Sequence, residues 1–352
     1  MTRRLLALVL VATSLFALQP VEPAAAVGRA RVVACKKPKA CWITAFAFTP
    51  AGDEIFYVER YSGEIRRVIL ATGSDTRWAK IKDVARVGEQ GVLGIALDPQ
   101  WESGEERVFA YYTERRPERN RIVRLSKGAG GLERKVLATI PATTFHDGGT
   151  IHFGPDGRLY ALTGDAGVPS RAQRVRNPAG KVLRMEEDGS RPSDNPFAKG
   201  RAFSIGHRNS FGFAFDPQTG RLWQTENGPT CDDEVNLVVP GRNYGWGGSS
   251  ACPRTSESGR KPVQPEVRIN PPTAPTGAAF CNACGLGAEV DGDLLYGTYL
   301  TKKIHALDLN ADRDAVAGRR VLLSHPRAVL ALEAAPDGVV YFSDLRAIYR
   351  LV

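Results

Sequence analysis

The sequence predicts an all-β protein folded as a six-bladed β-propeller, and three observations lead to this fold. A phrase of strand, turn and strand recurs six times, at intervals of roughly 50 to 75 residues. The 352 residues include 36 glycines and 23 prolines, a composition rich in turns. Because these two residue types recur so often, no amphipathic run extends beyond about three helical turns.

The six copies follow one pattern. A β-rich run ends in a turn, and an aromatic strand follows it; the turns lie at Pro50, Pro99, Pro155, Pro217, Asp291-Gly292 and Pro336. No copy can bury both faces of its small sheet alone, so neighbouring copies must stack. Six sheets closed into a ring do this and hide most strand edges, whereas a β-sandwich, the alternative, does not explain a sixfold phrase. We expect residues 42–48 to pair with the C-terminal strands and close the ring, because the last copy is short of strands.

The N-terminus has the pattern of a secretory signal peptide. Arg3 and Arg4 precede the apolar residues 5–18, and small residues follow at 24–26. We therefore predict a signal peptide at residues 1–26, an N-terminal extension at 27–41 and the propeller at 42–352. The mature protein is predicted to be secreted or periplasmic, without a stable membrane span, because no other stretch is apolar over a membrane's thickness.

Charge and cysteine content limit the partners and the compartment. The net charge is +9, but the basic residues are scattered and form no nucleic-acid motif, so no nucleic-acid partner is predicted. An even number of cysteines in an exported chain indicates disulfides. Six cysteines allow fifteen connectivities, and their order favours the pairs Cys35–Cys41, Cys231–Cys252 and Cys281–Cys284.

Four polar residues occupy the same offset in four copies. They stand nine residues before the proline turn and are Gln90, His146, Arg208 and Arg327. The strand before each turn is the inner strand of its blade, so these residues should form a ring at the mouth of the central channel. An imidazole, two guanidinium groups and an amide converging there would make a binding or catalytic site.

His146 is the candidate general base, since histidine titrates near neutral pH without perturbation; the alternative is a turn histidine bonded to backbone. Asp165, in Thr163-Gly164-Asp165, is placed to orient the imidazole or to cap a turn. The remaining candidates, His152, His305 and His325, have no partner pattern and are predicted to be structural.

Oxygen-bearing side chains cluster after the fourth turn. The cluster comprises Asp232, Asp233, Glu234, Asn236 and Tyr244. Such side chains, with backbone carbonyls from the turn at residues 228–229, are ligands that Ca²⁺ prefers, although an acidic run of this kind also occurs as a solvated loop.

These residues belong to a longer series of motifs, which resembles the soluble quinoprotein glucose/sorbosone (aldose sugar) dehydrogenases from about Trp42 to Val352. The motifs are Gly91-Val92-Leu93-Gly94, His146-Asp147-Gly148-Gly149, Gly154-Pro155-Asp156-Gly157, Thr163-Gly164-Asp165, Gly180-Lys181-Val182-Leu183-Arg184, Asp188-Gly189, Asp194-Asn195-Pro196-Phe197, Gly206-His207-Arg208-Asn209, Glu234-Val235-Asn236-Leu237 and Asn243-Tyr244-Gly245-Trp246.

The resemblance implies a six-bladed propeller that oxidises aldose sugars with pyrroloquinoline quinone (PQQ) and Ca²⁺ and passes electrons to an external acceptor. It implies that His146 takes the hydroxyl proton of the sugar, that Asp165 orients His146, and that Arg208 stabilises charge on the quinone oxygen. It further implies roles for two sets of residues. The cofactor set is Glu89, Gln90, Asn209, Asn227 and Arg327; the metal set is Gly228 and Pro229 for the cofactor's Ca²⁺, with Glu234 and Tyr244 for a second Ca²⁺.

Four positions depart from the family pattern. Glu89 replaces a glutamine two residues before Gly91, and Asn227 replaces a quinone-binding glutamine. A lysine of the fifth copy is replaced near Leu300, and an Arg-x-Arg-Asp phrase before the last turn reads Ala-Val-Leu-Ala at 328–331. PQQ carries three carboxylates, so the lost cationic partners would weaken its binding by several kcal/mol.

These departures keep two other functions open. One is a non-catalytic propeller that binds a glycan or protein partner. The other is a Ca²⁺-dependent propeller hydrolase such as a lactonase, which would use carboxylate and amide ligands in the channel.

Overall fold

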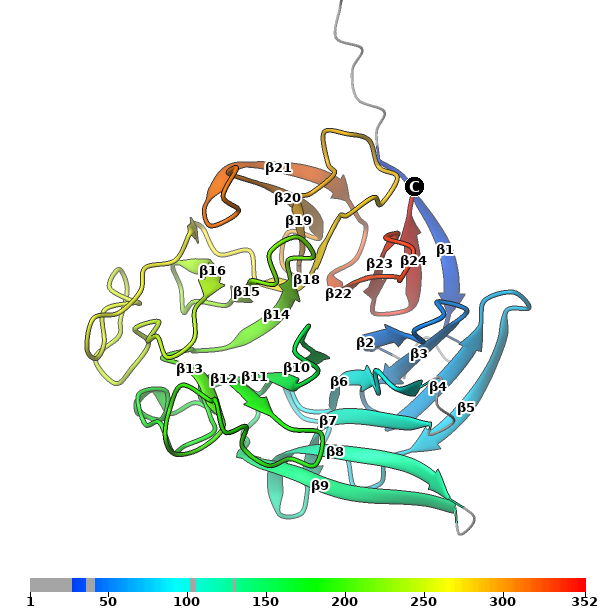
Figure 1. Cartoon of the computed structure of the whole chain (residues 1–352), viewed down its shortest axis with the longest axis horizontal. Helices are drawn as coiled ribbons and strands as arrows, with labels where there is room; N and C mark the ends of the chain where they lie inside the picture. Colours follow the sequence, from blue (N-terminus) through cyan, green and yellow to red (C-terminus); the bar gives the residue numbers. More distant parts are fainter. Residues whose placement is uncertain (1–26, 36–41, 102–105, 129–130) are drawn as a thin grey trace, which may run out of the picture.

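Six four-stranded antiparallel sheets form a ring, which confirms the predicted six-bladed β-propeller (Figure 1). The structure, a computed structural model, describes residues 27–35, 42–101, 106–128 and 131–352. No α-helix occurs in these ranges, and no helix there has the length and apolar character needed to cross a membrane. The predicted signal peptide lies outside the described residues.

Blades 1 to 3 follow one another along the chain, each running from an inner strand outward. Their strands are β2 (Ile43–Phe48), β3 (Glu54–Glu59), β4 (Glu64–Ile69) and β5 (Ser74–Lys80); β6 (Val92–Leu97), β7 (Arg107–Arg115), β8 (Glu118–Gly128) and β9 (Gly131–Pro141); and β10 (Gly148–Phe153), β11 (Leu159–Thr163), β12 (Lys181–Met185) and β13 (Ala202–Ile205). A short 3-10 helix, η2 (Pro169–Arg171), lies in the long loop of blade 3.

Blades 4 to 6 repeat the arrangement. Their strands are β14 (Ser210–Phe215), β15 (Leu222–Glu226), β16 (Asp233–Val238) and β17 (Val267–Ile269); β18 (Pro275–Phe280), β19 (Leu294–Thr298), β20 (Lys303–Leu309) and β21 (Val316–Ser324); and β22 (Val329–Ala334), β23 (Val340–Asp344), β24 (Ala347–Leu351) and β1 (Arg29–Ala34).

The ring is closed by β1, not by the segment that we expected to close it. β1 pairs antiparallel with β24, and Arg29 lies opposite Leu351 (Figure 1). Residues 43–48 instead form the inner strand of blade 1 and pair with β3. The expectation was wrong because blade 6 lacks only an outermost strand. The edge of β24 is completed by residues 29–34, which we had assigned to an N-terminal extension.

The core lies between the faces of neighbouring blades. Phe56 of blade 1 packs edge-on against Trp101 of blade 2, with 5.0 Å between the ring centroids. Between blades 4 and 5, Trp223 and Phe280 belong to another buried cluster. Each sheet therefore buries both faces only when it has neighbours, which explains why the repeat must close into a ring.

The inner strands share a feature at the end where they begin. Each shifts register against the second strand of its blade near this end, as between Gly148 and Ile151 in β10. Such bulges bend a strand and redirect side chains. The loops that precede the inner strands therefore carry their side chains to the centre of the ring.

Threonine hydroxyls on alternate inner strands bind the next blade. Thr44 Oγ1 donates to the carbonyl of Val92 at 2.6 Å, and Thr276 Oγ1 donates to the carbonyl of Val329 at 2.9 Å. Thr150 Oγ1 makes the equivalent bond to Phe211. These hydroxyls are bonded between blades, so they do not add reactive groups to the channel.

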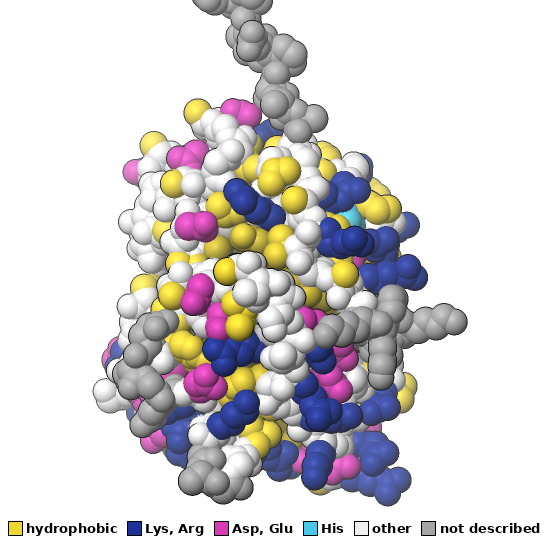
Figure 2. All heavy atoms as spheres, turned by 90° about the vertical axis from the view of Figure 1, so that its right-hand side faces the viewer, with side chains coloured by type: hydrophobic (Ala, Val, Ile, Leu, Met, Phe, Trp, Pro, Cys, Tyr) yellow, Lys and Arg dark blue, Asp and Glu magenta, His cyan; other side chains and the backbone are white. Residues whose placement is uncertain are grey.

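Two predicted disulfides are present. Cys231 pairs with Cys252, and Cys281 pairs with Cys284 in the loop after β18. The third predicted pair, Cys35–Cys41, includes a residue outside the described ranges. On the side of the molecule shown in Figure 2, Lys and Arg side chains are interspersed with Asp and Glu.

Candidate functional site at the channel mouth

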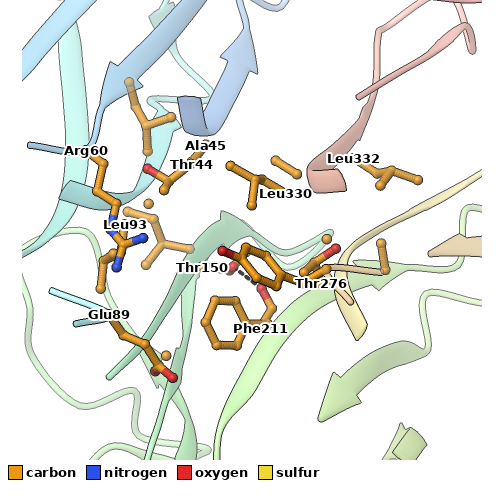
Figure 3. A pocket seen from close by; sticks show the side chains of 18 of the residues that line it. Thr44, Ala45, Arg60, Glu89, Leu93, Thr150, Phe211, Thr276, Leu330 and Leu332 are labelled. Atoms are coloured by element: carbon orange, nitrogen blue, oxygen red, sulfur yellow. Dashed lines mark hydrogen bonds between the residues drawn. The ribbon is translucent and has the colours of Figure 1, made fainter. Parts of the chain in front are cut away.

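A cavity of about 330 Å³ occupies the centre of the ring. Apolar side chains of the inner strands form its walls, including Leu93, Phe211 and Leu332 (Figure 3). Arg60, in the turn after β3, and Glu89, in the loop before β6, line one end of the cavity, and we call this end the mouth. The volume falls in the range of small-molecule sites, roughly 300 to 1,000 Å³.

His146 lies just before β10 in a strained backbone conformation. Its φ is 60°, which is uncommon outside glycine. The carbonyl of His146 accepts a hydrogen bond from Ala166 N, and a Cβ on Gly164 would lie 2.0 Å from that carbonyl oxygen. Gly164 is therefore required for the loop after β11 to approach the histidine. Strain held in this way is typical of functional positions.

The imidazole of His146 is oriented by Asp165. Nδ1 lies 2.8 Å from Asp165 Oδ1. The Asp165 carboxylate is fully buried and also accepts hydrogen bonds from Gly167 N and Trp246 Nε1, each at 2.7 Å. A carboxylate that only accepts places the proton on Nδ1 and leaves a lone pair on Nε2. No described residue donates to Nε2, and the His146 side chain is 14% exposed.

Arg208 lies on the other side of Trp246. Its guanidinium carbon is 5.3 Å from the centroid of the Trp246 ring, and Nη1 donates to the carbonyl of Asn227 at 2.9 Å. Burial lowers the pKa of Arg208, whereas the carboxylates of Asp165 and Glu226 oppose that shift. Nε is buried without a hydrogen-bond partner among the described residues. The structure thus brings the predicted catalytic residues together around one indole.

Glu89 connects three blades at the mouth. Its carboxylate accepts a hydrogen bond from His146 N at 2.8 Å and from Asn209 Nδ2 at 3.1 Å. Glu89 and Asn227 both line the cavity. The buried Oδ1 atoms of Asn209 and Asn227 have no partner in the described structure. Three of the predicted cofactor residues therefore lie at one site with unused polar atoms.

Two residues of the expected ring turn away from the mouth. Gln90 is 2% exposed, and its amide bonds Val87 N and the carbonyl of Thr143. Arg327 donates from Nε to Asp344 at 2.6 Å and from Nη2 to the hydroxyl of Tyr349. None of the four residues of the expected ring lines the central cavity itself, but His146 and Arg208 bond to the lining residues Glu89 and Asn227, and Gln90 and Arg327 do not. A shared offset places the backbone near the mouth, but each side chain turns to the partners in its own blade.

The predicted metal residues surround a second, much smaller cavity. Gly228, Pro229, Glu234 and Tyr244 line a space of about 10 Å³ next to Arg208, close to the minimum for one water. No described residue donates a hydrogen bond to the carbonyl oxygen of Gly228 or Pro229. The described ranges contain no group of three or more His, Cys, Asp or Glu side chains that could hold a metal ion.

The side chains of Glu234 and Tyr244 have different surroundings in that cavity. The Tyr244 hydroxyl donates to the carbonyl of Leu237 at 2.6 Å and accepts from Val239 N at 2.8 Å. Burial raises the pKa of Glu234 to about 8, and the negative charge of Glu226 adds to the shift. Arg268, whose Nη1 lies 3.8 Å from Glu234 Oε1, opposes this shift. A cation bound beside Glu234 would favour the ionised carboxylate further.

His152 and His305, which were predicted to be structural, contribute no charge at neutral pH. His305 stacks on Tyr296, and burial lowers the pKa of His305 to about 4. His152 lies at the far end of the cavity, where Nε2 is 3.5 Å from Glu333 Oε1. Burial lowers the pKa of His152 to about 4 and raises that of Glu333 well above its usual range. The far end is therefore uncharged, and the charge of the cavity is concentrated at its mouth.

The sequence analysis missed four residues at the mouth. Arg60, Trp42 and Tyr299 line the cavity, and Trp246 joins His146 to Arg208 through its contacts with Asp165 and the guanidinium. In the sequence, Trp246 appears only as the last residue of the motif at 243–246, which assigns it no role of its own. Arg60 follows the second strand of its blade, so a search at one offset before the inner strand did not find it.

Asp147, next to the candidate base, is expected to make folding stability depend on pH. Its side chain accepts from Asn120 Nδ2 at 2.8 Å, is 1% exposed, and has a pKa raised by burial to about 7. Glu89 and Glu118 raise this pKa further, whereas Arg60 attracts the ionised form. The folded state keeps the proton between pH 4 and 7 and the unfolded state does not, so stability falls as pH rises through that window.

The Asp147→Asn variant should lose less unfolding free energy than the parent between pH 5 and pH 8, by on the order of 2 kcal/mol. Urea unfolding at a series of pH values measures this difference. Replacement of the exposed Asp312 by asparagine is the control and should leave the pH dependence unchanged. Parallel curves for the parent and the Asp147 variant would contradict the assignment.

The chain is similar to known proteins over most of its length. The sequence matches the family model Glucose / Sorbosone dehydrogenase over residues 39–347. It is 33% identical over 230 residues to quinoprotein glucose dehydrogenase B of Acinetobacter calcoaceticus, covering 55% of this chain and 48%, about half, of that protein. It is 27% identical over 322 residues to aldose sugar dehydrogenase YliI of Escherichia coli, covering 84% and 85%.

A solved structure is similar over nearly the whole ring. It is the PQQ-bound form of aldose sugar dehydrogenase from Streptomyces coelicolor, with a TM-score of 0.79 and 27% identity. The match covers 94% of this chain and 98% of that one.

Proposed function

The chain belongs to the glucose/sorbosone dehydrogenase family, and from this premise we propose that it is an exported quinoprotein that oxidises aldose sugars with PQQ and Ca²⁺. The observation that carries the proposal is the oriented imidazole of His146, with an available Nε2 lone pair, which Asp165 and Trp246 link to Arg208. These residues adjoin the mouth of the cavity of about 330 Å³ through Glu89 and Asn227, which line it.

The residues of the mouth fit a planar, anionic cofactor. Arg60 and Arg208 each lack a carboxylate within salt-bridge distance among the described residues, and Arg208 Nε is buried without a partner. Aromatic side chains at the mouth, Trp42 and Tyr299, add flat apolar surface. Asn227 Oδ1 is a further unused buried acceptor. Guanidinium groups and aromatic faces are what a planar polycarboxylate requires.

The carbonyls of Gly228 and Pro229 are suited to hold the Ca²⁺ that accompanies the cofactor, since hard cations prefer oxygen ligands and these two carbonyls receive no hydrogen bond from described residues. Bound PQQ would supply the acceptor for the hydrogen and two electrons that leave the sugar carbon. Glu234 and Tyr244 would take part in a second Ca²⁺ site.

His146 would act as the general base. Its Nε2 would take the proton of the sugar hydroxyl, and the charge that develops on the ring would be stabilised by Asp165 at 2.8 Å. Arg208 would stabilise negative charge that develops across the site, because its donors are held in place by Asn227 and Trp246. Glu89 would hold the backbone of His146 in position.

Two features of the chain support export. The N-terminal residues have a signal-peptide pattern, and the two disulfides suit an oxidising compartment. An external acceptor would collect the electrons, which a soluble exported enzyme must pass on.

Reconstitution tests the proposal. The purified protein, stripped with a chelator, is incubated with PQQ and Ca²⁺, and dye reduction is followed with a panel of aldoses. Sugar-dependent reduction should require both additions, and chelation should remove activity that Ca²⁺ restores. No uptake of PQQ at micromolar concentration would refute the proposal and favour a non-catalytic binding protein. Quinone-independent lactone cleavage would favour a hydrolase.

A further inference from the structure

Arg60 is a buried guanidinium without a carboxylate partner. It follows β3 and is 9% exposed. Its Nε donates to the carbonyl of Gln90 at 2.9 Å, and Nη2 donates to the carbonyl of Gly88 at 2.5 Å. Among the described residues it makes no salt bridge, and no hydrogen bond is made by Nη1. A buried cation of this kind is costly unless an anion neutralises it.

The surroundings of Arg60 hold it in a fixed position. Its guanidinium carbon lies 5.2 Å from the ring centroid of Trp42 and 4.9 Å from that of Tyr61. A Cβ on Gly91 would lie 2.4 Å from Arg60 Cγ, so only glycine leaves room for this side chain. Two aromatic faces and two carbonyls therefore orient the guanidinium, which points into the cavity (Figure 3).

Arg60 faces the site from the blade opposite Arg208. Arg60 belongs to blade 1 and Arg208 precedes the inner strand of blade 4, three blades away in a ring of six. The carboxylate of Glu89 interacts electrostatically with both guanidinium groups; Asp147 also acts on Arg60, and Asp165, Glu226 and Asp233 also act on Arg208. No carboxylate of the described residues lies within ion-pair distance of Arg60, so its Nη1 remains free to donate to an incoming anion.

We propose that Arg60 is the anchor for a carboxylate of the bound cofactor, on the side of the mouth away from Arg208. This inference rests on the proposed function. It also accounts for the missing cations of blades 5 and 6: Leu330 lines the cavity where the family pattern has a charged phrase, and Arg327 is occupied by Asp344. The positive charge that fixes the anion is thus supplied by the first blade.

A comparison of the binding of PQQ and of its uncharged ester separates recognition of the carboxylate charge from recognition of the ring shape. The dissociation constants of PQQ and of its uncharged trimethyl ester are measured on the metal-loaded protein by fluorescence quenching. The parent should bind PQQ more tightly than the ester. Arg60→Met should weaken PQQ binding by roughly 10- to 100-fold, the range expected for a lost charge-assisted hydrogen bond, and leave ester binding almost unchanged. Turnover is not needed for either measurement.

Two further variants control the experiment. Arg86→Met removes an exposed positive charge from the loop before Glu89 and should change PQQ binding less than twofold. Arg60→Lys keeps the positive charge but loses the planar donor geometry of the guanidinium. Its affinity for PQQ should therefore lie between those of the parent and of Arg60→Met. Thermal melting checks that each variant is folded. If Arg60→Met does not fold, the test rests on Arg60→Lys. Unchanged PQQ binding by Arg60→Lys would then overturn the inference.

The outcomes separate the two proposals. A parent protein that binds no PQQ refutes the proposed function. A parent that binds PQQ, with Arg60→Met binding it equally well or losing PQQ and ester affinity alike, refutes the role of Arg60 and leaves the proposed function standing.

Discussion

Replacement of His146 by alanine is expected to lower kcat for aldose oxidation by about 10²- to 10⁴-fold, the range over which a positioned general base contributes. The side chain supplies the one oriented imidazole among the described residues of the mouth, and Asp165 fixes its tautomer through Nδ1. No other described residue at the mouth offers a comparable proton acceptor, because Glu89 is already engaged by His146 N and Asn209.

Single-turnover reduction of PQQ-loaded protein by sugar measures this effect, and PQQ binding should be retained. Added imidazole should restore part of the rate in the alanine variant, since the cavity created by the truncation faces the mouth. His305→Asn is the matched control, because His305 is a buried histidine of blade 5 outside the site. Unchanged turnover in the His146 variant would remove the general-base assignment.

Replacement of Asp165 by asparagine should have the second-largest effect, a fall in kcat of about 10²- to 10⁴-fold with a smaller change in KM. Three donors converge on this carboxylate: His146 Nδ1, Gly167 N and Trp246 Nε1. An amide nitrogen in place of one oxygen would face a donor instead of accepting from it. Either His146 then no longer carries its proton on Nδ1, or Trp246 loses its hydrogen bond to residue 165 and its position against Arg208.

The split between kcat and PQQ affinity distinguishes this role from a purely structural one. Because Asp165 accepts from His146 Nδ1, its loss should lower kcat while leaving the dissociation constant of PQQ almost unchanged. The exposed Asp188, replaced by asparagine, controls for the general loss of an acidic side chain. A lowered melting temperature with an unchanged kcat would show that Asp165 acts only in folding.

The arrangement of buried charge at the mouth gives these predictions a common basis. Buried polar groups are arranged in sequence around the opening, from Glu226 behind Arg208 to Asp165 behind His146. Asp165 thus supports the ring of His146, whereas Glu226 accepts a hydrogen bond from the backbone N of Arg208. Supports of this kind fix the side chains before a ligand arrives, which reduces the reorganisation that the reaction requires.

Much of the fold follows from local features of the sequence. The sixfold phrase, the proline turns and the absence of helical periodicity determined the number of blades. The order of the cysteines favoured the pairs Cys231–Cys252 and Cys281–Cys284, which the structure contains. These features act within one blade or between adjacent residues. The closing strand was predicted incorrectly because residues 29–34 carry no copy of the phrase, and their pairing with β24 depends on contacts across the whole chain.

The candidate site divides in the same way. The common offset and the family motifs identified His146, Asp165 and Arg208, which the structure joins through Trp246. Gln90 and Arg327 share that offset but bind within their own blades. Sequence spacing determines where a backbone lies on the ring, whereas the nearest unsatisfied donor or acceptor determines where its side chain points. Arg60, with its two aromatic faces and no anion, was therefore revealed only by the tertiary structure.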